Sequence, residues 1–401
     1  MKRVGMMKVG RREFLASTAV LAASCNAFAA RALAVASPYP NYNTSPIAPD
    51  ATGMTRTAVE VAARIKLGWN AGNTMEAIGG ETAWGNPEIT QQLISRVKEL
   101  GFDAVRLPCA WDQYADHKTA KISDTWLNRV KDVVQYCINA DLYVLLNIHW
   151  DGGWLENHVD VASKDAVVAK QRAFWEQIST HLRDFDERLM FASANEPDAK
   201  TAEQADVLLA YHQAFVDTVR ATGGKNAYRV LVVQAPSTST ELALSLWKHE
   251  PADPAPNRLM LEVHDYTPFQ FTLLSSDASW GKMFYYWGKD HHSTIEPERN
   301  ATWGEEADFD KQFAAIKTQY ADAGIPVVMG EYAAMRRSSG PKDMATHNAS
   351  ITHWMKYVTQ VAITNGAMPF LWDAGGYIDR RTLAVKDQES LNAILEAAGK
   401  K

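Results

Sequence analysis

The sequence predicts a closed (β/α)8 barrel, a TIM barrel in which eight parallel strands alternate with helices. Short apolar runs rich in β-branched residues recur along the chain, and helical patterns separate most of them. Strands that alternate with helices favour a parallel sheet, and eight repeats favour a closed barrel over an open, doubly wound sheet. With 401 residues and 46% hydrophobic content, the chain can bury the core of such a domain.

Most of the eight predicted strands begin roughly 40 residues apart. They cover residues 65–67, 104–107, 143–148, 189–192, 230–233, 259–263, 326–329 and 366–371. The first intervening helix has Pro87 near its start and Gly101 beyond its end, with apolar residues on one face between them. A later helix is expected to begin at Thr201, because Thr201 and Gln204 have the spacing of a capping box.

The segment after the sixth strand is unusually long, with no helical pattern before residues 308–323. It is rich in aromatic side chains, namely Phe269, Phe271, Trp280, Phe284, Tyr285, Tyr286, Trp287 and Trp303. Long loops above the carboxyl ends of barrel strands commonly form a binding cleft. We therefore expect this loop to be functional, the alternative being an insertion that only packs.

Residues 1–36 have the composition of an export signal, with a charged start, an apolar segment and a small-residue cleavage site. The Arg11-Arg12 pair resembles a twin-arginine signal, which implies export of the folded protein from a bacterial cytoplasm to the periplasm or beyond. Lipoprotein processing at Cys25 is a weaker alternative. Residues 37–53 are expected to form an exposed leader, and residues 54–401 the barrel domain.

Cys109 and Cys137 are the thiols that remain after removal of the signal. Cys109 follows a strand, whereas Cys137 lies about a dozen residues into the next helix, which carries it about 18 Å toward the other end of the unit. We expect two separate core thiols rather than a disulfide.

The charge and composition of the chain limit the classes of ligand and partner that it can bind. The net charge is -6, with no basic block beyond the N-terminus, so the electrostatic signature of nucleic-acid binding is missing. No glycine motif for phosphate and no calcium loop occurs, so no cofactor is expected. The 13 Trp and 14 Tyr suit a neutral ligand such as a sugar, whose rings stack on aromatic faces. We expect a monomer with no membrane contact beyond export.

Two glutamates, Glu196 and Glu331, directly follow predicted strands. Paired carboxylates suit glycoside hydrolysis, in which one carboxyl protonates the leaving oxygen and the other attacks or stabilises the sugar carbon. Polar and aromatic residues also follow nearly all of the remaining strands, and they are expected to converge on one rim. This rim set comprises Asn70, Asn73, Arg106, His149, Trp150, Asn195, His264, Tyr266 and Trp372.

The strings 68–74 (GWNAGNT) and 81–87 (ETAWGNP), with the rim residues, resemble glycoside hydrolase family 5, the cellulase family, and its subfamily 4. The resemblance spans roughly residues 64–372, and eight functional positions of the family match in residue type. These are Arg106, His149, Asn195, Glu196, His264, Tyr266, Glu331 and Trp372. There are two departures, since many relatives have a second His at Trp150 and a second Tyr at Asp265.

The resemblance implies a retaining enzyme with Glu196 as acid/base and Glu331 as nucleophile. Arg106 and Tyr266 are expected to hydrogen-bond Glu331 and favour its charged form, and the second carboxylate about 5 Å away is expected to raise the pKa of Glu196. Asn195 would bind the 2-hydroxyl of the sugar, and Trp372 would form the floor of the sugar subsite. His149 and His264 would orient these groups; a metal site is disfavoured because the pattern offers no further ligands.

The resulting function is that of an endo-β-1,4-glucanase acting by double displacement on cellulose, mixed-linkage glucan and xyloglucan. Two alternatives stay open. One is a β-mannanase or another retaining enzyme of the same family. The other is a barrel that binds glycans without catalysis, although the presence of both Glu196 and Glu331 argues against it.

Overall fold

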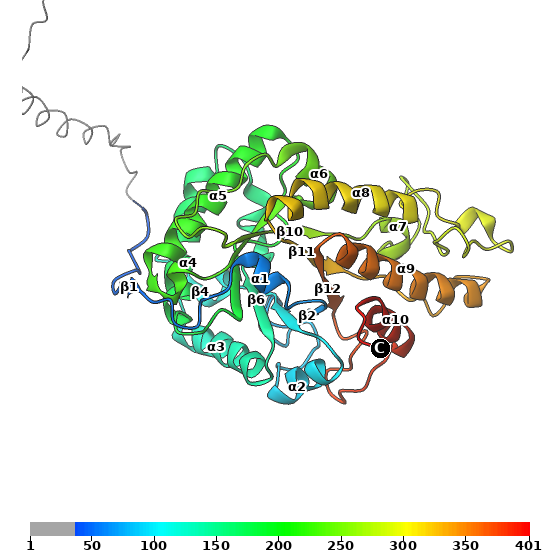
Figure 1. Ribbon diagram of the computed structural model, residues 1–401, viewed down its shortest axis with the longest axis horizontal. Coiled ribbons are helices and arrows are strands. Elements are labelled where there is room, and N and C mark those ends of the chain that lie inside the picture. Colours follow the sequence, from blue (N-terminus) through cyan, green and yellow to red (C-terminus); the bar gives the residue numbers. More distant parts are fainter. Residues whose placement is uncertain (1–36) are drawn as a thin grey trace, which may run out of the picture. The chain divides into compact units, whose positions relative to one another are not determined.

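The computed structural model describes residues 37–401 (Figure 1), and residues 39–401 form one compact unit. The predicted export signal and Cys25 lie outside the described residues, so both stay predictions. Most residues from 39 to 53 are exposed, as expected of a leader. They nevertheless contact the domain, because the Tyr42 hydroxyl donates to the Thr119 carbonyl at 2.7 Å.

Eight parallel strands close into a barrel, as the sequence predicts. Around the barrel they follow chain order, each hydrogen-bonded to the next. The strands are β2 (Gly68–Ala71), β3 (Ala104–Leu107), β6 (Tyr143–Asn147), β7 (Leu189–Ala192), β9 (Leu231–Ser239), β10 (Leu259–His264), β11 (Val327–Tyr332) and β12 (Ala367–Asp373). Their carboxyl ends therefore meet at one rim.

Helices surround the barrel (Figure 1). They are α1 (Ala58–Ala62), α2 (Gln91–Glu99), α3 (Asp124–Asn139), α4 (Lys164–His181), α5 (Ala202–Ala221), α6 (Thr240–Leu246), α7 (Phe269–Thr272), α8 (Glu306–Gln319), α9 (Met344–Thr364) and α10 (Gln388–Ala397). Four short strands outside the barrel were not predicted: β1 (Ile47–Pro49), β4 (Ala115–Asp116), β5 (Lys121–Ile122) and β8 (Gly223–Gly224).

The predicted bounds of the first strand are wrong, because β2 begins at Gly68 rather than Ile65. Ile65 instead packs into the lower barrel core. Gly68 is required where it stands, since a Cβ there would lie 2.1 Å from the ring of Phe370. The shift places Asn70 inside the strand and inside the barrel, where it is fully buried.

The lower barrel interior is apolar and the upper end is polar. One apolar cluster fills the lower barrel, and its members include Met190, Val232, Met260 and Phe370. Helix α1 closes the bottom of the barrel, where Ala58 and Val61 join this cluster. The ion pairs and hydrogen bonds of Arg106, Glu262, His264 and Glu331 form above this layer. The apolar floor thus keeps water out beneath the charged groups.

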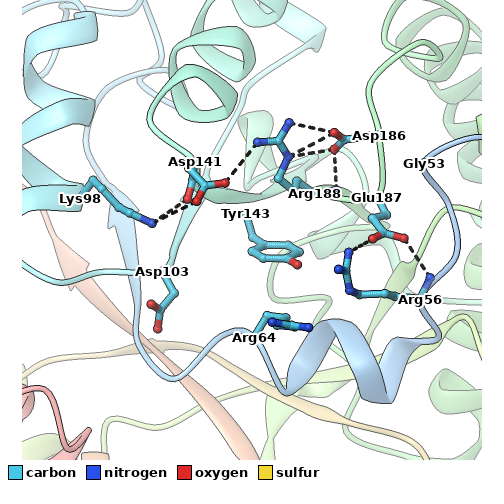
Figure 2. Close-up of a pocket in the computed structure, with 10 residues that line it drawn as sticks. All are labelled: Gly53, Arg56, Arg64, Lys98, Asp103, Asp141, Tyr143, Asp186, Glu187 and Arg188. Carbon is cyan, nitrogen blue, oxygen red and sulfur yellow. Dashed lines mark hydrogen bonds and ion pairs between the residues drawn. The ribbon is translucent and has the colours of Figure 1, made fainter.

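A polar pocket of about 420 Å³ lies at the opposite, N-terminal end of the strands (Figure 2). Its acidic side chains are paired with basic ones: Glu187 with Arg56, and Asp186 with Arg188 at 2.8 Å. Stability, rather than catalysis, is the usual role of this end of a barrel. We therefore assign these pairs to the structure of the lower rim.

The long loop after β10 divides into a packed part and an exposed part. Five of its eight aromatic residues are buried and pack in the protein, namely Phe271, Phe284, Tyr285, Tyr286 and Trp287, so the functional role expected of the loop stays a prediction that concerns its exposed part. The other three are exposed, with exposed fractions of 45% for Phe269, 63% for Trp280 and 46% for Trp303. Periodicity could not separate the two groups, because the helices within this segment, such as the four-residue α7, are too short to impose a period.

Cys109 and Cys137 are buried free thiols, which confirms the prediction. Within residues 37–401, none of the helices has the length and apolar character needed to cross a membrane.

Replacing Trp287 with Ala should lower the free energy of unfolding by about 3–5 kcal/mol, because the ring is fully buried and its indole nitrogen donates to the Gly304 carbonyl at 2.7 Å. Denaturant unfolding measures the change. The matched control is Trp280→Ala in the same loop, where the exposed ring should leave stability within about 0.5 kcal/mol of the original. Equal losses in both variants would contradict the division of the loop.

Candidate active site

The carboxylate of Glu331 lies at the end of β11, where both of its oxygens accept hydrogen bonds. Arg106 donates to Oε1 at 2.8 Å, and the Tyr266 hydroxyl donates to Oε2 at 3.0 Å. Only 8% of the side chain is exposed. This confirms that Arg106 and Tyr266 contact Glu331, and it leaves the carboxylate fixed in orientation.

Arg106 on β3 connects several strands through its guanidinium group. Its Nη1 also donates to Asn70 at 3.0 Å, and its Nη2 donates to Asn195 at 2.8 Å. Its Nε forms an ion pair with Glu262 at 2.8 Å. Because the side chain is fully buried and both Nη atoms donate hydrogen bonds, the guanidinium cannot rotate freely, so the positions of Glu331 and Asn195 are fixed relative to each other.

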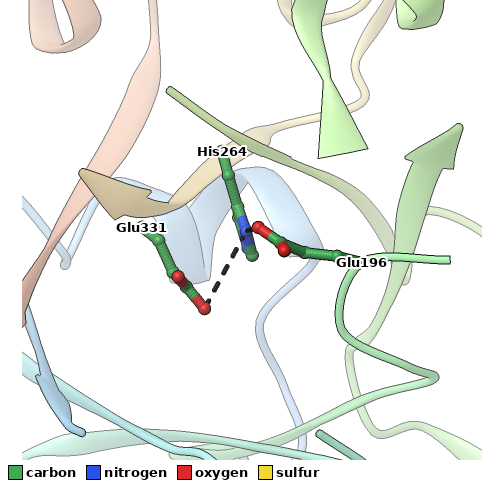
Figure 3. Close-up of side chains that lie close together, drawn as sticks. All are labelled: Glu196, His264 and Glu331. Carbon is green, nitrogen blue, oxygen red and sulfur yellow. Dashed lines mark hydrogen bonds and ion pairs between the residues drawn. The ribbon is translucent and has the colours of Figure 1, made fainter. Parts of the chain in front are cut away.

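His264 lies between the two predicted catalytic glutamates (Figure 3). Its Nδ1 is 2.7 Å from Oε1 of Glu196 and 3.8 Å from Oε1 of Glu331. One oxygen of each glutamate and one ring nitrogen all lie within 4.8 Å of one another. The side chain of Glu196 is 46% exposed, so it faces the solvent from which a substrate would arrive.

The charges of this cluster set its pKa values. Burial lowers the pKa of His264, but Glu331, Glu196 and Glu262 outweigh it and raise the pKa to about 10. Burial raises the pKa of Glu331 above its usual value, more than His264 and Arg106 lower it. At neutral pH the imidazole is therefore charged and donates a proton toward Glu196.

The expected raised pKa of Glu196 is not found. Burial raises its pKa, but the hydrogen bond and charge of His264, with Arg106, outweigh burial and hold the pKa below its usual value. The sequence argument counted the neighbouring carboxylate and omitted the imidazolium that lies between the two. In the free site, the proton that a general acid needs thus resides on His264, 2.7 Å away.

Glu262 and Glu156, which were not among the predicted residues, support the site together with Asn70 of the predicted rim set. Asn70 donates to the Gly330 carbonyl at 2.8 Å while it accepts from Arg106. Glu262 contacts both Arg106 and His264, and Glu156 accepts from the backbone N–H of Glu196 at 2.7 Å. For Glu262 the available signal was a polar residue inside an apolar strand run; Glu156 gave none, since it lies in a short 3-10 helix outside the strand pattern.

The remaining predicted residues lie around this network. The rings of His149 and Trp372 are stacked, with centroids 5.8 Å apart, and His149 Nδ1 is 3.2 Å from the Asn147 amide nitrogen. Asn73 adopts a left-handed backbone (φ 57°), which suits a turn. Trp150 is 42% exposed. Within residues 37–401, neither Asn73 nor Trp150 joins the hydrogen-bonded network around Glu331.

The three groups Glu196, His264 and Glu331 also have the spacing of metal ligands. The imidazole fits that role poorly, because its Nδ1 and Nε2 both face carboxylates, at 2.7 Å from Glu196 and 3.2 Å from Glu262. A ring that donates from both nitrogens has no lone pair for a cation. The cluster therefore suits proton sharing.

A pocket of about 590 Å³ adjoins the site. Trp372 lines one part of it, and Met335, Tyr377 and Leu273 line others. Asp265, at one of the two departures from the family pattern, is buried beside the site and accepts from the Thr267 backbone N–H at 2.9 Å. The pocket gives an extended ligand room beyond the catalytic residues.

Comparison with known proteins agrees with this geometry. The family model of cellulase (glycosyl hydrolase family 5) matches residues 69–377. A xyloglucan-specific endo-β-1,4-glucanase of Bacteroides ovatus is 36% identical over 376 residues, covering 87% of this chain and 72% of its own length. A Bacteroides ovatus family 5 xyloglucanase, solved in complex with a XXXG heptasaccharide, has a TM-score of 0.83 at 33% identity, covering 90% of this chain and 80% of that one.

A broad-specificity endoglucanase of subfamily 4 from Bacteroides salanitronis has a TM-score of 0.76 at 31% identity, with 88% of this chain and 97% of that one covered. The resemblance predicted from the sequence is thereby confirmed for the family, and its structural neighbours include members of subfamily 4.

The raised pKa of His264 predicts how stability depends on pH. Because the folded pKa lies above the unfolded value, the imidazolium stabilises the fold fully below about pH 6.5, and this stabilisation is lost as the pH rises toward about 10. His264→Gln should therefore flatten the decline in unfolding free energy between pH 7 and 10, measured by denaturant unfolding at each pH.

His212→Gln is the matched control, because His212 is also fully buried but its pKa is lowered to about 4, so it is neutral throughout this range. It should lower stability without changing the slope. An unchanged slope in His264→Gln would contradict the charged imidazole.

Proposed function

This chain belongs to glycosyl hydrolase family 5, the cellulase family, and from that premise we propose that it is a retaining endo-β-1,4-glucanase that cleaves β-glucans, xyloglucan among them, by double displacement. The observation that carries the proposal is the approach of Glu196 and Glu331 to within 4.8 Å, with His264 between them. Retaining glycosidases have carboxyl groups about 5–5.5 Å apart, whereas inverting enzymes need roughly 6.5–9.5 Å to admit a water.

In the first step, Glu331 attacks the anomeric carbon and the bond to the leaving oxygen breaks. Arg106 and Tyr266 hold the attacking carboxylate and keep its two oxygens distinct. Asn195 is aligned by the same guanidinium, so it can contact the sugar hydroxyl beside the reacting carbon. The sugar becomes esterified to Glu331, and the leaving chain takes a proton from Glu196.

Binding of substrate supplies the acid form of Glu196. In the free site nearly half of its side chain is exposed, so water reaches the carboxylate, while His264 and Arg106 hold it in the ionised form. A sugar chain that covers it removes that water and raises its pKa. The proton on His264 Nδ1 can then pass along the 2.7 Å contact to Glu196, next to the leaving oxygen.

In the second step, water attacks the esterified carbon and Glu196 takes its proton. Esterification removes the negative charge of Glu331. Less negative charge then favours the protonated form of Glu196, so Glu196 can act as the base. The two steps each invert the carbon, and the product keeps the β-configuration of the substrate.

A neutral, extended substrate fits the surroundings of the site. The pocket beside Trp372 is lined mostly by uncharged residues, and the exposed rings of Phe269 and Trp280 lie 6.1 Å apart. Because α7 begins three residues after Tyr266, we expect these rings to adjoin the site. Aromatic faces bind sugar rings and leave the hydroxyl edges free, so branched chains such as xyloglucan are accommodated.

The first product released from a β-glucan should be the β-anomer, and Glu331→Gln should abolish its formation while polysaccharide binding is retained. Proton NMR during the first turnovers distinguishes the two anomers of the product. Affinity electrophoresis in a gel that contains the glucan measures binding. Glu203→Gln, an exposed glutamate on α5, is the control and should behave as the original. An α-anomer first would overturn the retaining mechanism, and faster cleavage of mannan than of every β-glucan would overturn the substrate.

Trp280→Ala and Phe269→Ala should each raise the KM for polymeric β-glucan about fivefold, since one stacking contact contributes roughly 1 kcal/mol, while a short aryl cellobioside is hydrolysed at the original rate. Steady-state kinetics on both substrates separates the effects. Ile295→Ala is the control, because Ile295 is equally exposed in the same loop but has no ring. If the polymer KM is unchanged in both variants, the rings do not bind the chain.

A further inference from the structure

We propose that Glu262 is a positioning residue, which holds His264 with its Nδ1 proton directed at Glu196 and at the same time fixes Arg106 against Glu331. The inference rests on the proposed function, because it assigns a role within that reaction. Glu262 itself is completely buried below the rim and reaches neither the cleft nor the substrate. It would act only through the two cations that it contacts.

The contacts of Glu262 account for both of its carboxylate oxygens. Oε1 lies 2.8 Å from Nε of Arg106 and 3.2 Å from Nε2 of His264. Oε2 accepts a hydrogen bond from Gln234 at 2.6 Å. One oxygen therefore serves the two catalytic-site cations, while the other is anchored to β9, so the carboxylate cannot swing away from either cation.

The contact with Nε2 determines what the opposite ring nitrogen can do. The Glu262 carboxylate, 3.2 Å from Nε2, favours a proton on that nitrogen and outweighs the Nη2 donor of Arg106 at 3.4 Å, and a second carboxylate, Glu196, lies at Nδ1. A ring that donates at both positions is an imidazolium. Without Glu262, His264 could satisfy Glu196 as a neutral ring with the proton on Nδ1 alone, and it would then have no extra proton to pass on.

The absence of a side chain at Gly330 leaves room for the Glu262 carboxylate. Gly330 lies beside Glu331, and a Cβ on Gly330 would lie 2.0 Å from Oε1 of Glu262. Any other residue before Glu331 would therefore displace the Glu262 carboxylate. The glycine next to the nucleophile and the glutamate below the site thus form one structural unit, although they lie on different strands, β11 and β10.

Other charged groups also face His264, so the effect of Glu262 must be separated from theirs. They are Glu196 after β7, Glu331 on β11, Arg106 on β3, His149 after β6 and Tyr266 after β10. Glu262 differs from Glu196 in being completely buried, and its own pKa is held low because Arg106 and His264 outweigh that burial. It stays negative while Glu196 and Glu331 exchange protons and bonds.

The test removes this charge and follows His264 directly. In Glu262→Gln the ring NMR signals of His264, assigned with His264→Gln, should titrate about 1–3 pH units lower than in the original protein, because a carboxylate at this distance shifts a pKa by that amount. The alkaline limb of the pH profile of kcat/KM on β-glucan should move to lower pH in the same direction, since the proton on His264 is lost earlier.

A second variant covers the case in which Glu262→Gln fails to fold. The new amide would place its N–H group against that of Gln234, so Glu262→Gln combined with Gln234→Glu restores a donor–acceptor pair and keeps the buried charge count. The charge then no longer touches His264, and the titration should remain shifted. Glu187→Gln is the matched control, a buried glutamate with an arginine partner at the far end of the barrel, and it should shift neither quantity.

An unshifted His264 titration in both Glu262 variants would overturn the inference. That result is independent of the proposed function, because NMR reports the ring whether or not the protein hydrolyses a glycan. Conversely, absence of hydrolysis by the original protein would overturn the proposed function and leave the titration to decide the role of Glu262. A shifted titration with an unchanged pH profile would also overturn the positioning role, because the charge would then have no effect on the reaction.

Discussion

The buried guanidinium of Arg106 is the constraint on which the rest of the upper barrel depends. A fully buried cation is unfavourable unless its donors are satisfied and its charge is balanced. Here Asn70, Glu331 and Asn195 accept hydrogen bonds from the two Nη atoms, and Glu331 and Glu262 balance the charge; each of the four comes from a different strand or strand end. The need to satisfy one side chain therefore fixes the relative positions of four others, including Glu331 and Asn195, the residue next to Glu196.

The division of the barrel interior into an apolar floor and a charged upper layer follows from the same constraint. Water would screen the ion pairs of Arg106 and weaken their hold on Glu331. The cluster that contains Met260, Val328 and Phe370, closed below by α1, excludes water from beneath. Above, Glu331 is 8% exposed and Glu196 is 46% exposed, so the two carboxylates have different environments although they are close neighbours.

The sequence predicted the barrel and the residues that line its rim, because strand periodicity and strand-end chemistry are local patterns. It missed what depends on long-range packing. The start of β2 was wrong because Gly68 and Asn70 interrupt an apolar run for reasons that lie on β12 and β3. The pKa direction of Glu196 was wrong because the position of His264 between two carboxylates is a property of three strands together. Burial of Trp287 and exposure of Trp280 likewise differ only through tertiary contacts.

The unequal exposure of the two glutamates suggests how one site can both store and deliver a proton. While Glu196 is solvated, the imidazolium of His264 is the favoured location of the proton, because three carboxylates surround the ring. A bound sugar chain desolvates the exposed carboxylate and hardly changes the buried one, so binding alone alters the relative proton affinity of His264 and Glu196. Nothing in the protein has to move for this. In the proposed mechanism, the acid form of Glu196 thus arises when the glycosidic oxygen is bound, and Glu196 stays ionised in the free protein.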